Sequence, residues 1–388
     1  MPKVRRIRVL QFLCSTVRAG AEEVALDLVR GLDPGRFRSY LVCPRSLLET
    51  FGCEWRVADA EALALSLYLP WQIGPARRFV NYLRSRQIDV VHAHMVRASV
   101  VAVPLARLAG VPVVVQTCHG REAWRTSGLR RRYWIDRLIG GLSDATIAVS
   151  ESTRDYLLQE KQLDPRKVVV IRNGRSLAGF TPSPDRQERL RAEFGVRPGE
   201  VVLGVFGRLE EQKGHRYLLE ALSLVLDQVP EVKVLLVGDG SLRGQLEFQA
   251  QSHGLCGCVL FTGYRYDWKD LMALSDLVLL PSLYEGLPLV PIEAAILGKP
   301  VLATSVDGTR EVVVDGFTGR LVPPGQSRPF AEALIELLRH PELRLRLGEG
   351  AQVRALDLFS LERQLLQTSD LYSQLVEGTT PQQRKMIA

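Results

Sequence analysis

The sequence predicts an α/β protein built from two doubly wound, Rossmann-like domains that face each other across a cleft. Short runs of Val, Ile and Leu recur along the chain, and segments with helical periodicity separate them. A proline-rich stretch near the middle interrupts this alternation, which then restarts. Alternating strands and helices indicate parallel sheets with right-handed crossovers. The 388 residues suffice for two domains of about 150 to 200 residues each.

Six apolar runs in the first half are predicted as strands buried on both faces, as in parallel sheets. Between them, a helix over 22–32 places Val24 and Leu28 on one face. A second helix, over 97–108, ends before Gly110. The six predicted strands are 7–13, 39–43, 89–93, 112–117, 145–149 and 168–171.

The stretch 179–199 is rich in proline and charge, so we expect a connection with one short helix there. Residues 330–378 are almost wholly helical, and their last part could cross back onto the first domain. We predict a first domain of residues 1–175, a second of 176–365, and a returning helix with a tail over 366–388. The predicted strands of the second domain are 201–206, 232–237, 258–261, 277–280 and 301–304, with helices at 217–226, 242–251 and 290–297.

The charge is divided unevenly between the two halves. Residues 1–175 contain 28 Lys and Arg against 16 Asp and Glu, a net +12, and the remainder contains 22 against 27, a net −5. A basic first half could attract nucleic acid, an anionic membrane or an anionic acceptor. No nucleic-acid motif accompanies the charge, so we expect no nucleic-acid partner.

Cysteine usage and hydropathy predict a protein of the reducing cytosol. The six cysteines lack C-x-x-C spacing, which disfavours a zinc ribbon or a disulfide framework. No apolar run reaches the roughly 18 to 20 residues of a membrane span. The loop after the first strand is not G-x-G-x-x-G, and no G-x-x-x-x-G-K-[ST] occurs, which disfavours nicotinamide and P-loop chemistry.

The strongest local motif is Y-E-G-L-P-L-V-P-I-E over residues 284–293, directly after a predicted strand. Ligands of open α/β sheets bind beyond the carboxyl ends of the strands, so such loops should carry the chemistry. Glycine and proline mark a turn into a helix, and backbone N–H groups near Gly286 and Leu287 should point out of its N-terminus. We expect a diphosphate to bind there.

Two carboxylates flank this helix start. Glu293 could accept two hydrogen bonds from a ribose diol, while Glu285 in the loop could hold sugar hydroxyls. Val290, in the first turn, is a further candidate for donor binding. Either carboxylate alone could be a surface residue, but a second, basic motif strengthens the functional interpretation.

That basic motif is G-R-L-E-E-Q-K-G over residues 207–214, after the first strand of the second domain. Arg208 and Lys213 are placed to bind a leaving diphosphate and to stabilise its developing charge as a sugar departs. Arg265, in a third strand-end loop, could meet the nucleotide base or could be solvated.

Three histidines lie at strand ends of the first domain. His119 directly follows a predicted strand and precedes a glycine, so it should face across the cleft toward the donor sugar. His92 and His94 flank an earlier strand end, and we interpret both as structural residues.

Together these motifs resemble the GT-B glycosyltransferase family 4, the retaining glycosyltransferases group 1. Its E-x7-E signature is matched by Glu285 and Glu293, its G-R-x(4)-K-G loop by residues 207–214, and its T-x-H-G by residues 117–120. The similarity extends from Ile7 to about Val376. The combination of motifs is specific, although the E-x7-E spacing alone is not.

The resemblance implies a role for each motif residue. Glu293 would bind the ribose, while Glu285 and the backbone of Gly286 and Leu287 would hold the sugar. The two cations of residues 207–214 would bind the diphosphate, and His119 would approach the reacting centre.

The resemblance also implies a reaction. A hexose-type sugar would pass from a UDP- or GDP-sugar to a hydroxyl of a glycan or lipid-linked acceptor with retention of configuration. A same-face displacement, in which a leaving phosphate oxygen helps to deprotonate the acceptor, would need no catalytic metal or other cofactor. No D-x-D metal motif is evident in a cleft loop, which agrees with a reaction that needs no catalytic metal.

Two departures from the family pattern affect the expected donor geometry. Many members have Gly-Gly after the first strand where this chain has Ala19-Gly20, although Gly20 can still let backbone approach the diphosphate. The family's N-G-V-D at the domain junction is replaced by Asn-Gly-Arg-Ser over 173–176. Arg175 could add a phosphate contact, but we expect it to be solvated.

The segment Arg121 to Arg137 combines Trp124, Tyr133 and Trp134 with six arginines, a composition that suits a lipid interface. We hypothesise that the first domain docks on an anionic membrane, at its inner face, to reach a lipid-linked or surface-polysaccharide acceptor. An ordinary helix with an aromatic core face and a basic solvated face is an equal alternative.

Three other functions are compatible with parts of the sequence. A sugar-nucleotide epimerase or a phosphorylase would use the same two-domain architecture, but the E-x7-E motif argues against both. A non-catalytic module that binds a polyanion has only the basic first half in its favour.

Overall fold

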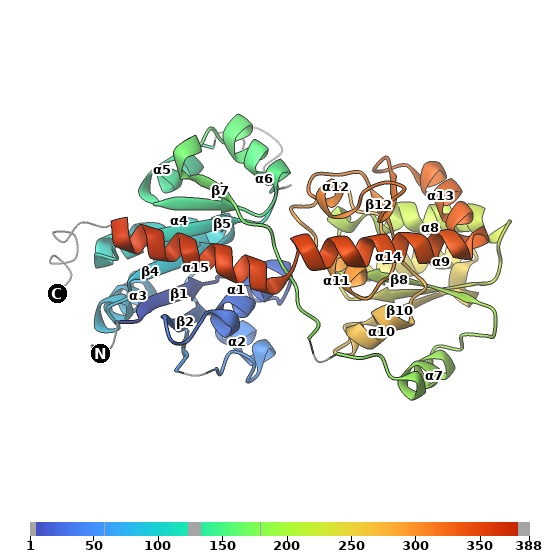
Figure 1. Ribbon diagram of the computed structural model, residues 1–388, viewed down its shortest axis with the longest axis horizontal. Coiled ribbons are helices and arrows are strands. Elements are labelled where there is room, and N and C mark those ends of the chain that lie inside the picture. Colours follow the sequence, from blue (N-terminus) through green and yellow to red (C-terminus); the bar gives the residue numbers. More distant parts are fainter. Residues whose placement is uncertain (1–4, 58, 123–132, 179, 379–388) are drawn as a thin grey trace. The chain divides into compact units, whose positions relative to one another are not determined.

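The computed structural model describes residues 5–57, 59–122, 133–178 and 180–378. The chain forms two compact units (Figure 1). The first unit comprises Met1–Asn173 and Leu361–Ala388, and the second comprises Gly174–Ser360. The sequence-based boundaries at residues 175 and 365 lie within a few residues of these limits. The connection 179–199 belongs to the second unit and contains the one short helix that we expected.

The first unit is built on a seven-stranded parallel sheet with strand order β3-β2-β1-β4-β5-β6-β7. Each predicted strand of this domain is present, with ends that differ by one or two residues. The strands are β1 Ile7–Phe12, β2 Phe37–Cys43, β3 Glu61–Ala64, β4 Val90–His94, β5 Val113–Cys118, β6 Ala145–Ala148 and β7 Val168–Val170.

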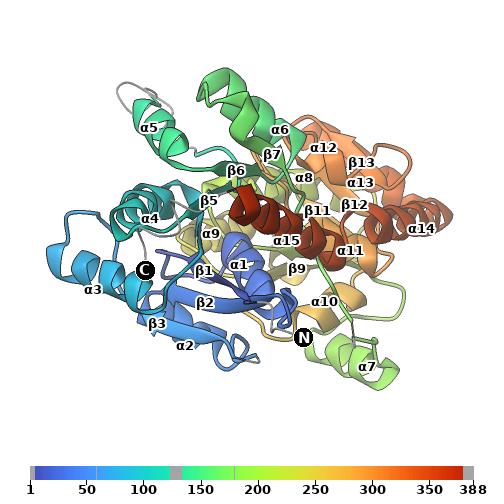
Figure 2. The same ribbon diagram turned by 60° about the vertical axis from the view of Figure 1, so that its left-hand side comes forward.

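Helices cover both faces of this sheet. Successive residues of β1 point to opposite faces. Leu10 belongs to the core cluster that contains Phe79 of α3 (Ile73–Ser85) and Ala98 of α4 (Met95–Ala109). Val9 belongs to the cluster that contains Tyr372 of α15 (Leu361–Gly378). Figure 2 shows α3, α4 and α5 side by side as one layer, and α4 packs against both neighbours. The helices are α1 Gly20–Gly31, α2 Arg45–Phe51, α3 Ile73–Ser85, α4 Met95–Ala109, α5 Trp134–Leu142, α6 Glu151–Asp155 and α15 Leu361–Gly378, with a π-helical turn at Tyr156–Glu160 and a 3-10 turn at Pro165–Lys167.

The last helix, α15, belongs to the first unit although it follows the whole second unit in the sequence. It packs against α1 and β5, and Figure 1 shows it lying along the sheet of the first unit. Tyr372 of α15 is fully buried there. The predicted return of the C-terminal helix to the first domain is therefore confirmed.

The second unit repeats the same topology with six parallel strands in the order β10-β9-β8-β11-β12-β13. The strands are β8 Val201–Phe206, β9 Val232–Val237, β10 Val259–Gly263, β11 Leu277–Leu280, β12 Val301–Thr304 and β13 Gly319–Val322. The helices are α7 Pro184–Glu193, α8 His215–Leu226, α9 Arg243–Ser252, α10 Trp268–Leu274, α11 Leu289–Ile296, α12 Thr309–Val312, α13 Ser327–Arg339 and α14 Pro341–Leu358, with 3-10 turns at Glu211–Lys213 and Leu255–Gly257.

Two strands were missed, and both lie at sheet edges. β3 and β13 have only four residues each, and both include partly exposed positions. Edge strands pack against fewer neighbours than central ones, so they need less apolar sequence and give a weaker signal. Their omission leaves the doubly wound fold class unchanged.

The strand orders locate the two switch points where ligands of such sheets bind. In the first unit the direction of winding reverses between β1 and β4, and in the second unit between β8 and β11. The loops that follow β8 and β11 are those that carry the motifs of residues 207–214 and 284–293. Among the residues that the structure describes, no helix is both long and apolar enough to cross a bilayer.

The close packing of α14 against the turn at Gly298 can be tested at Gly348. A Cβ atom there would lie 2.1 Å from the carbonyl oxygen of Gly298, a backbone atom that cannot rotate away. Alanine in a helix gains about 0.5–1 kcal/mol over glycine, but overpacking costs about 1–3 kcal/mol. We expect Gly348→Ala to lower the unfolding free energy of the second unit, measured by urea denaturation.

A matched control is Gly244→Ala in α9, where an added Cβ atom meets nothing within 4 Å. This variant should be as stable as the parent or slightly more stable. Equal stabilisation by both substitutions would contradict the close approach of α14 to the turn at Gly298.

Candidate functional site

The loops after β8 and β11 are joined to each other at the switch point of the second unit. The backbone N–H of Leu283 donates to the carbonyl oxygen of Gln212 at 2.8 Å, and the Gln212 side-chain amide donates to the carbonyl oxygen of Tyr284 at 3.0 Å. Gly214 has φ +64, and a Cβ atom there would lie 2.1 Å from the carbonyl oxygen of Pro281. Only glycine allows this approach. We call residues 207–214 and 281–288 together the strand-end site.

The strand-end site centres on a partly buried ion pair. Nζ of Lys213 lies 2.6 Å from Oε1 of Glu285, and the Ser282 hydroxyl donates to the same oxygen at 2.7 Å. The backbone N–H of Glu285 donates to Oδ2 of Asp307 at 3.2 Å. No described residue donates to Oε2 of Glu285. This oxygen can accept a hydrogen bond from a ligand hydroxyl.

Arg208 lies at the exposed rim of the strand-end site. Its Nη2 atom is 3.5 Å from Oε1 of Gln212, a contact at the limit of hydrogen bonding. The carbonyl oxygen of Arg208 is 3.1 Å from Nε2 of the buried His215 at the start of α8. Burial lowers the pKa of His215 to about 4, so this ring is neutral at pH 7. The Arg208 guanidinium is therefore available to an anion, while its backbone is fixed.

Helix α11 begins at the strand-end site. Pro288 occupies its N-cap position and cannot supply a side-chain acceptor to the first-turn N–H groups. Gly286 and Leu287 are buried immediately before it, and Val290 is partly exposed in its first turn. A Cβ atom on Gly308 would lie 1.8 Å from the carbonyl oxygen of Gly286, so a second loop fixes this turn. Such a helix start favours an anionic ligand.

Glu293 lies one turn farther along α11, and it is buried. Nε of Arg175 is 2.8 Å from Oε1 of Glu293, with both side chains only 9% exposed. The expectation that Arg175 is solvated is therefore wrong. A guanidinium at this position compensates a carboxylate that burial would otherwise destabilise.

Arg265 is held by acidic side chains. It makes two contacts of 2.8 Å with the carboxylate of Asp267 and one of 2.8 Å with Glu193. The hydrogen bonds that Arg265 donates to Asp267, together with its contacts to Glu193, raise the pKa of Arg265 against the effect of partial burial. No contact between described residues joins Arg265 to the strand-end site.

The three histidines of the first unit lie in one chain of contacts at its switch point. Nδ1 of His94 is 3.3 Å from Nε2 of His119, and Nε2 of His94 is 2.8 Å from Oε1 of Gln11. Burial lowers the pKa of His119 to about 4 and that of His92 to about 3. All three rings are neutral at pH 7. His92 and His94 are buried and hydrogen bonded, as we expected for structural residues.

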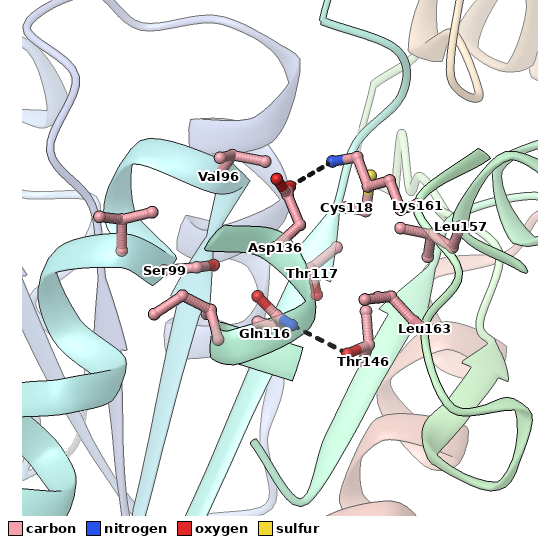
Figure 3. Close-up of a pocket in the computed structure, with 12 residues that line it drawn as sticks. Val96, Ser99, Gln116, Thr117, Cys118, Asp136, Thr146, Leu157, Lys161 and Leu163 are labelled. Atoms are coloured by element: carbon pink, nitrogen blue, oxygen red, sulfur yellow. Dashed lines mark hydrogen bonds and ion pairs between the residues drawn. The ribbon is translucent and has the colours of Figure 1, made fainter. Parts of the chain in front are cut away.

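A separate pocket of the first unit contains a buried lysine (Figure 3). Nζ of Lys161 lies 2.9 Å from Asp136 and 3.0 Å from Glu122, and its side chain is 2% exposed. The neighbouring Gln116 amide donates to Thr146 at 2.9 Å. These groups satisfy one another, so we interpret the pocket as part of the packing. The described residues contain no group of three or more His, Cys, Asp or Glu side chains that could hold a metal ion.

Known proteins resemble this chain over both units. Residues 18–178 match the model of Glycosyltransferase Family 4, and residues 186–354 match that of Glycosyl transferases group 1. EpsF of Bacillus subtilis (strain 168) is 30% identical over 314 residues, which are 76% of this chain and 78% of EpsF. The chain belongs to glycosyltransferase family 4. The resemblance that the motifs indicated is thereby confirmed, and the protein is a glycosyltransferase.

One further relative and one solved structure each match nearly the whole glycosyltransferase. The UDP-Gal:alpha-D-GlcNAc-diphosphoundecaprenol alpha-1,3-galactosyltransferase of Escherichia coli is 25% identical over 379 residues, which are 96% of this chain and 98% of that protein. The crystal structure of Anabaena HepE in complex with UDP and glucose has a TM-score of 0.84 at 24% identity, covering 95% of this chain and 100% of HepE. The GT-B fold is confirmed.

The glycosyltransferase thus gathers most of the predicted donor residues in its second unit. Lys213 and Glu285 are in direct contact, and Arg208 is tied to them through Gln212. Gly286, Leu287, Val290 and Glu293 follow on the same loop and helix. Gly20 and His119 belong to the first unit, where Gly20 is the first residue of α1.

The motifs did not reveal several residues that shape the glycosyltransferase's sites. Ser282 and Asp307 hold Glu285, and Gln212 joins the two loops. Ser282 lies three residues before Glu285, so a hydroxyl at that spacing was a detectable signal. Asp307 follows a different strand, and only the fold brings it close.

The pair of Arg175 and Glu293 gives a test of the second unit's interior. Breaking a buried ion pair by removing one partner typically costs about 3–5 kcal/mol, because the other charge stays buried. We expect Arg175→Met to lower the unfolding free energy by that order, measured by urea denaturation of the second unit.

The double variant with Arg175→Met and Glu293→Gln serves as the control. It removes both charges, so we expect it to be more stable than Arg175→Met alone. Additive losses in a double-mutant cycle would show that the two side chains do not interact.

Proposed function

We propose that this glycosyltransferase transfers a hexose from a nucleotide diphosphate sugar to a hydroxyl of a glycan or lipid-linked acceptor, with retention of configuration. The observation that carries the proposal is the contact of Lys213 with Glu285 at the start of α11. This contact supports the proposal because an ammonium that could bind phosphate, a carboxylate that could bind sugar hydroxyls and a helix N-terminus lie within one site.

We propose UDP as the nucleotide carrier, with GDP as the alternative. The galactosyltransferase of Escherichia coli is named for UDP-Gal, and HepE was crystallised with UDP and glucose. Glu293, the buried fifth residue of α11, would accept hydrogen bonds from the ribose. Its pairing with Arg175 fixes one carboxylate oxygen in place.

The charges of the strand-end site support leaving-group stabilisation. When the bond between sugar and phosphate breaks, negative charge develops on the diphosphate, and preorganised cations lower the energy of that state. Lys213 offers a compact ammonium and Arg208 a planar guanidinium at the rim. We propose that these two cations and the α11 N-terminus supply this stabilisation, and that no catalytic metal is required.

Retention is proposed to follow from attack on the face that the diphosphate leaves. A phosphate oxygen would take the acceptor proton, so the protein need not provide a strong base. His119 is neutral and would contact the donor sugar as a hydrogen-bonding group, because burial keeps its pKa near 4. Glu285 would hold the sugar through the carboxylate oxygen that has no described donor.

We propose that the enzyme acts in the cytosol on a membrane-associated, lipid-linked acceptor, such as a precursor of a surface polysaccharide. Helix α5 exposes Trp134, Leu138 and Leu142 at a spacing of four residues, which places them on one face. Arg137 is exposed beside them. Of the predicted segment, Trp124, Arg125 and Arg130 to Arg132 lie outside the described residues. An apolar stripe flanked by arginine suits an anionic lipid surface.

Removal of the site's cations tests the catalytic role. We expect Arg208→Ala or Lys213→Ala to lower kcat by about two to three orders of magnitude, as when one group that stabilises developing charge is removed. The measurement is nucleotide release from a panel of UDP-, GDP- and ADP-sugars, with acceptor present for turnover. The same panel identifies the nucleotide.

Arg328→Ala is the matched control, since Arg328 is an exposed arginine on α13 of the same unit. Its kcat should equal that of the parent. Near-normal turnover of both site variants would contradict the assigned roles, and no nucleotide release from any sugar would contradict the proposed donor.

Membrane docking gives a second test of the proposed function. We expect the enzyme to co-sediment with phosphatidylglycerol vesicles at physiological salt, and the double substitution of Trp134 and Leu138 by Ala to reduce binding roughly tenfold or more, because two apolar side chains leave the interface. Phe248→Ala controls for loss of an exposed aromatic side chain, since Phe248 is 73% exposed on α9 of the second unit. Failure of the parent protein to co-sediment would overturn the docking hypothesis.

A further inference from the structure

A continuous chain of hydrogen bonds crosses the interior of the first unit and ends at His119. It starts at the hydroxyl of Tyr372 on α15, which lies 2.5 Å from Nδ1 of His92 and 3.3 Å from Nε2 of Gln11. Oε1 of Gln11 is 2.8 Å from Nε2 of His94, and Nδ1 of His94 is 3.3 Å from Nε2 of His119. The other ring nitrogen of His92 is 2.6 Å from the hydroxyl of Thr117.

The members of this chain face the same side of the sheet. Gln11 on β1 is paired in register with His92 on β4, and His94 on β4 is paired with Thr117 on β5. Gln11, His92 and His94 are each 1% exposed, and Tyr372 is fully buried. Water therefore cannot replace a missing partner at low cost, and each group must be satisfied by its neighbour.

The amide of Gln11 gives the chain a direction. Its N–H₂ group donates to the Tyr372 hydroxyl, so its oxygen faces His94 and can only accept. Nε2 of His94 must then carry the proton, which leaves Nδ1 of this neutral ring as an acceptor. Nε2 of His119 must in turn donate to it.

The same direction holds at the other end of the chain. The buried Tyr372 hydroxyl hydrogen needs an acceptor, and Nδ1 of His92 is the described group in contact with it that can accept. Nε2 of this neutral ring then donates to Thr117. If every group is to stay hydrogen bonded, reversing the direction of one of these hydrogen bonds requires reversing the others as well.

We infer that Gln11, His94 and Tyr372 are positioning residues that hold His119 as the tautomer with a proton on Nε2 and a lone pair on Nδ1. No described residue hydrogen bonds to Nδ1 of His119. This nitrogen is presented as an acceptor for a hydroxyl group of the bound sugar. The inference rests on the proposed function only in naming the sugar as the ligand of Nδ1.

Charge and burial support this assignment. Burial keeps all three imidazoles neutral at pH 7, so each ring has one donor and one acceptor nitrogen, as the chain requires. A protonated His119 would offer two donors and could not accept a hydroxyl hydrogen at Nδ1.

The test reads the tautomer directly in the full chain without substrate. Two-bond ¹H–¹⁵N correlation spectra of histidine-labelled enzyme distinguish a protonated from an unprotonated ring nitrogen, and His119→Gln assigns the signals. We expect Nε2 of His119 to be protonated in the parent enzyme. A predominant proton on Nδ1 would overturn the inference.

Tyr372→Phe is the decisive variant because Tyr372 does not touch His119. The ring keeps its packing against Phe37, with ring centroids 6.3 Å apart, while the hydroxyl is lost. The Gln11 amide is then free to turn over, so we expect both tautomers of His119 to appear. We also expect the apparent donor KM to rise, by about twofold where the two tautomers are equally populated, because only one of them accepts the sugar hydroxyl.

Tyr82→Phe is the matched control. Tyr82 is a partly buried tyrosine of the same unit whose hydroxyl donates to Glu61 at 3.1 Å, outside the chain. It should leave the His119 tautomer unchanged. His94→Gln is a second variant, since an amide can donate or accept and should also allow both tautomers.

The outcomes separate this inference from the proposed function. An unchanged His119 tautomer in both Tyr372→Phe and His94→Gln would overturn the positioning role, even if the enzyme transfers sugar. A tautomer that responds as expected in an enzyme inactive toward every nucleotide sugar would support the positioning role and contradict the proposed function.

Discussion

The candidate donor site depends on backbone atoms that approach more closely than any side chain would allow. Gly214 lies against the carbonyl oxygen of Pro281, and Gly308 lies against that of Gly286. These contacts bring the loops after β8, β11 and β12 together at one edge of the sheet. Lys213 and Glu285 are 72 positions apart in the sequence and meet because of them. The glycines therefore determine the geometry in which the charged side chains act.

Within that frame, charge is balanced before any ligand binds. Lys213 faces Glu285, and Arg175 faces Glu293. A buried carboxylate without a partner would raise the energy of the free protein, so each pairing offsets a desolvation cost. A diphosphate that shares Lys213 would leave Glu285 with the Ser282 hydroxyl and with its second oxygen open to sugar hydroxyls. The site is therefore suited to bind the two parts of a sugar nucleotide together.

The sequence predicted features that are local and failed for features that depend on distant partners. The predicted ends of the strands β8 and β9 agree with the observed ends residue for residue. A run of Val and Leu is buried wherever such a sheet forms, so its limits can be read from the sequence. Arg175 was expected to be solvated because its partner, Glu293, is 118 positions away. Asp307 was missed for the same reason. The strand-end position of Lys213 and Glu285 was predictable, since their motifs directly follow strong strands.

The polar groups inside the first unit need hydrogen-bond partners from a part of the chain far away in the sequence. Gln11, His92, His94 and Thr117 lie on three adjacent central strands, where parallel sheets are usually apolar on both faces. An unsatisfied buried polar group costs about 1–3 kcal/mol, so a strand-end histidine surrounded by such groups needs a complete set of partners. Among the described residues, the strands provide no hydrogen-bond partner for the N–H₂ group of Gln11 or for Nδ1 of His92. The hydroxyl of Tyr372 supplies both contacts from α15. The return of the last helix to the first unit thus satisfies polar groups of the strands as well as burying apolar surface.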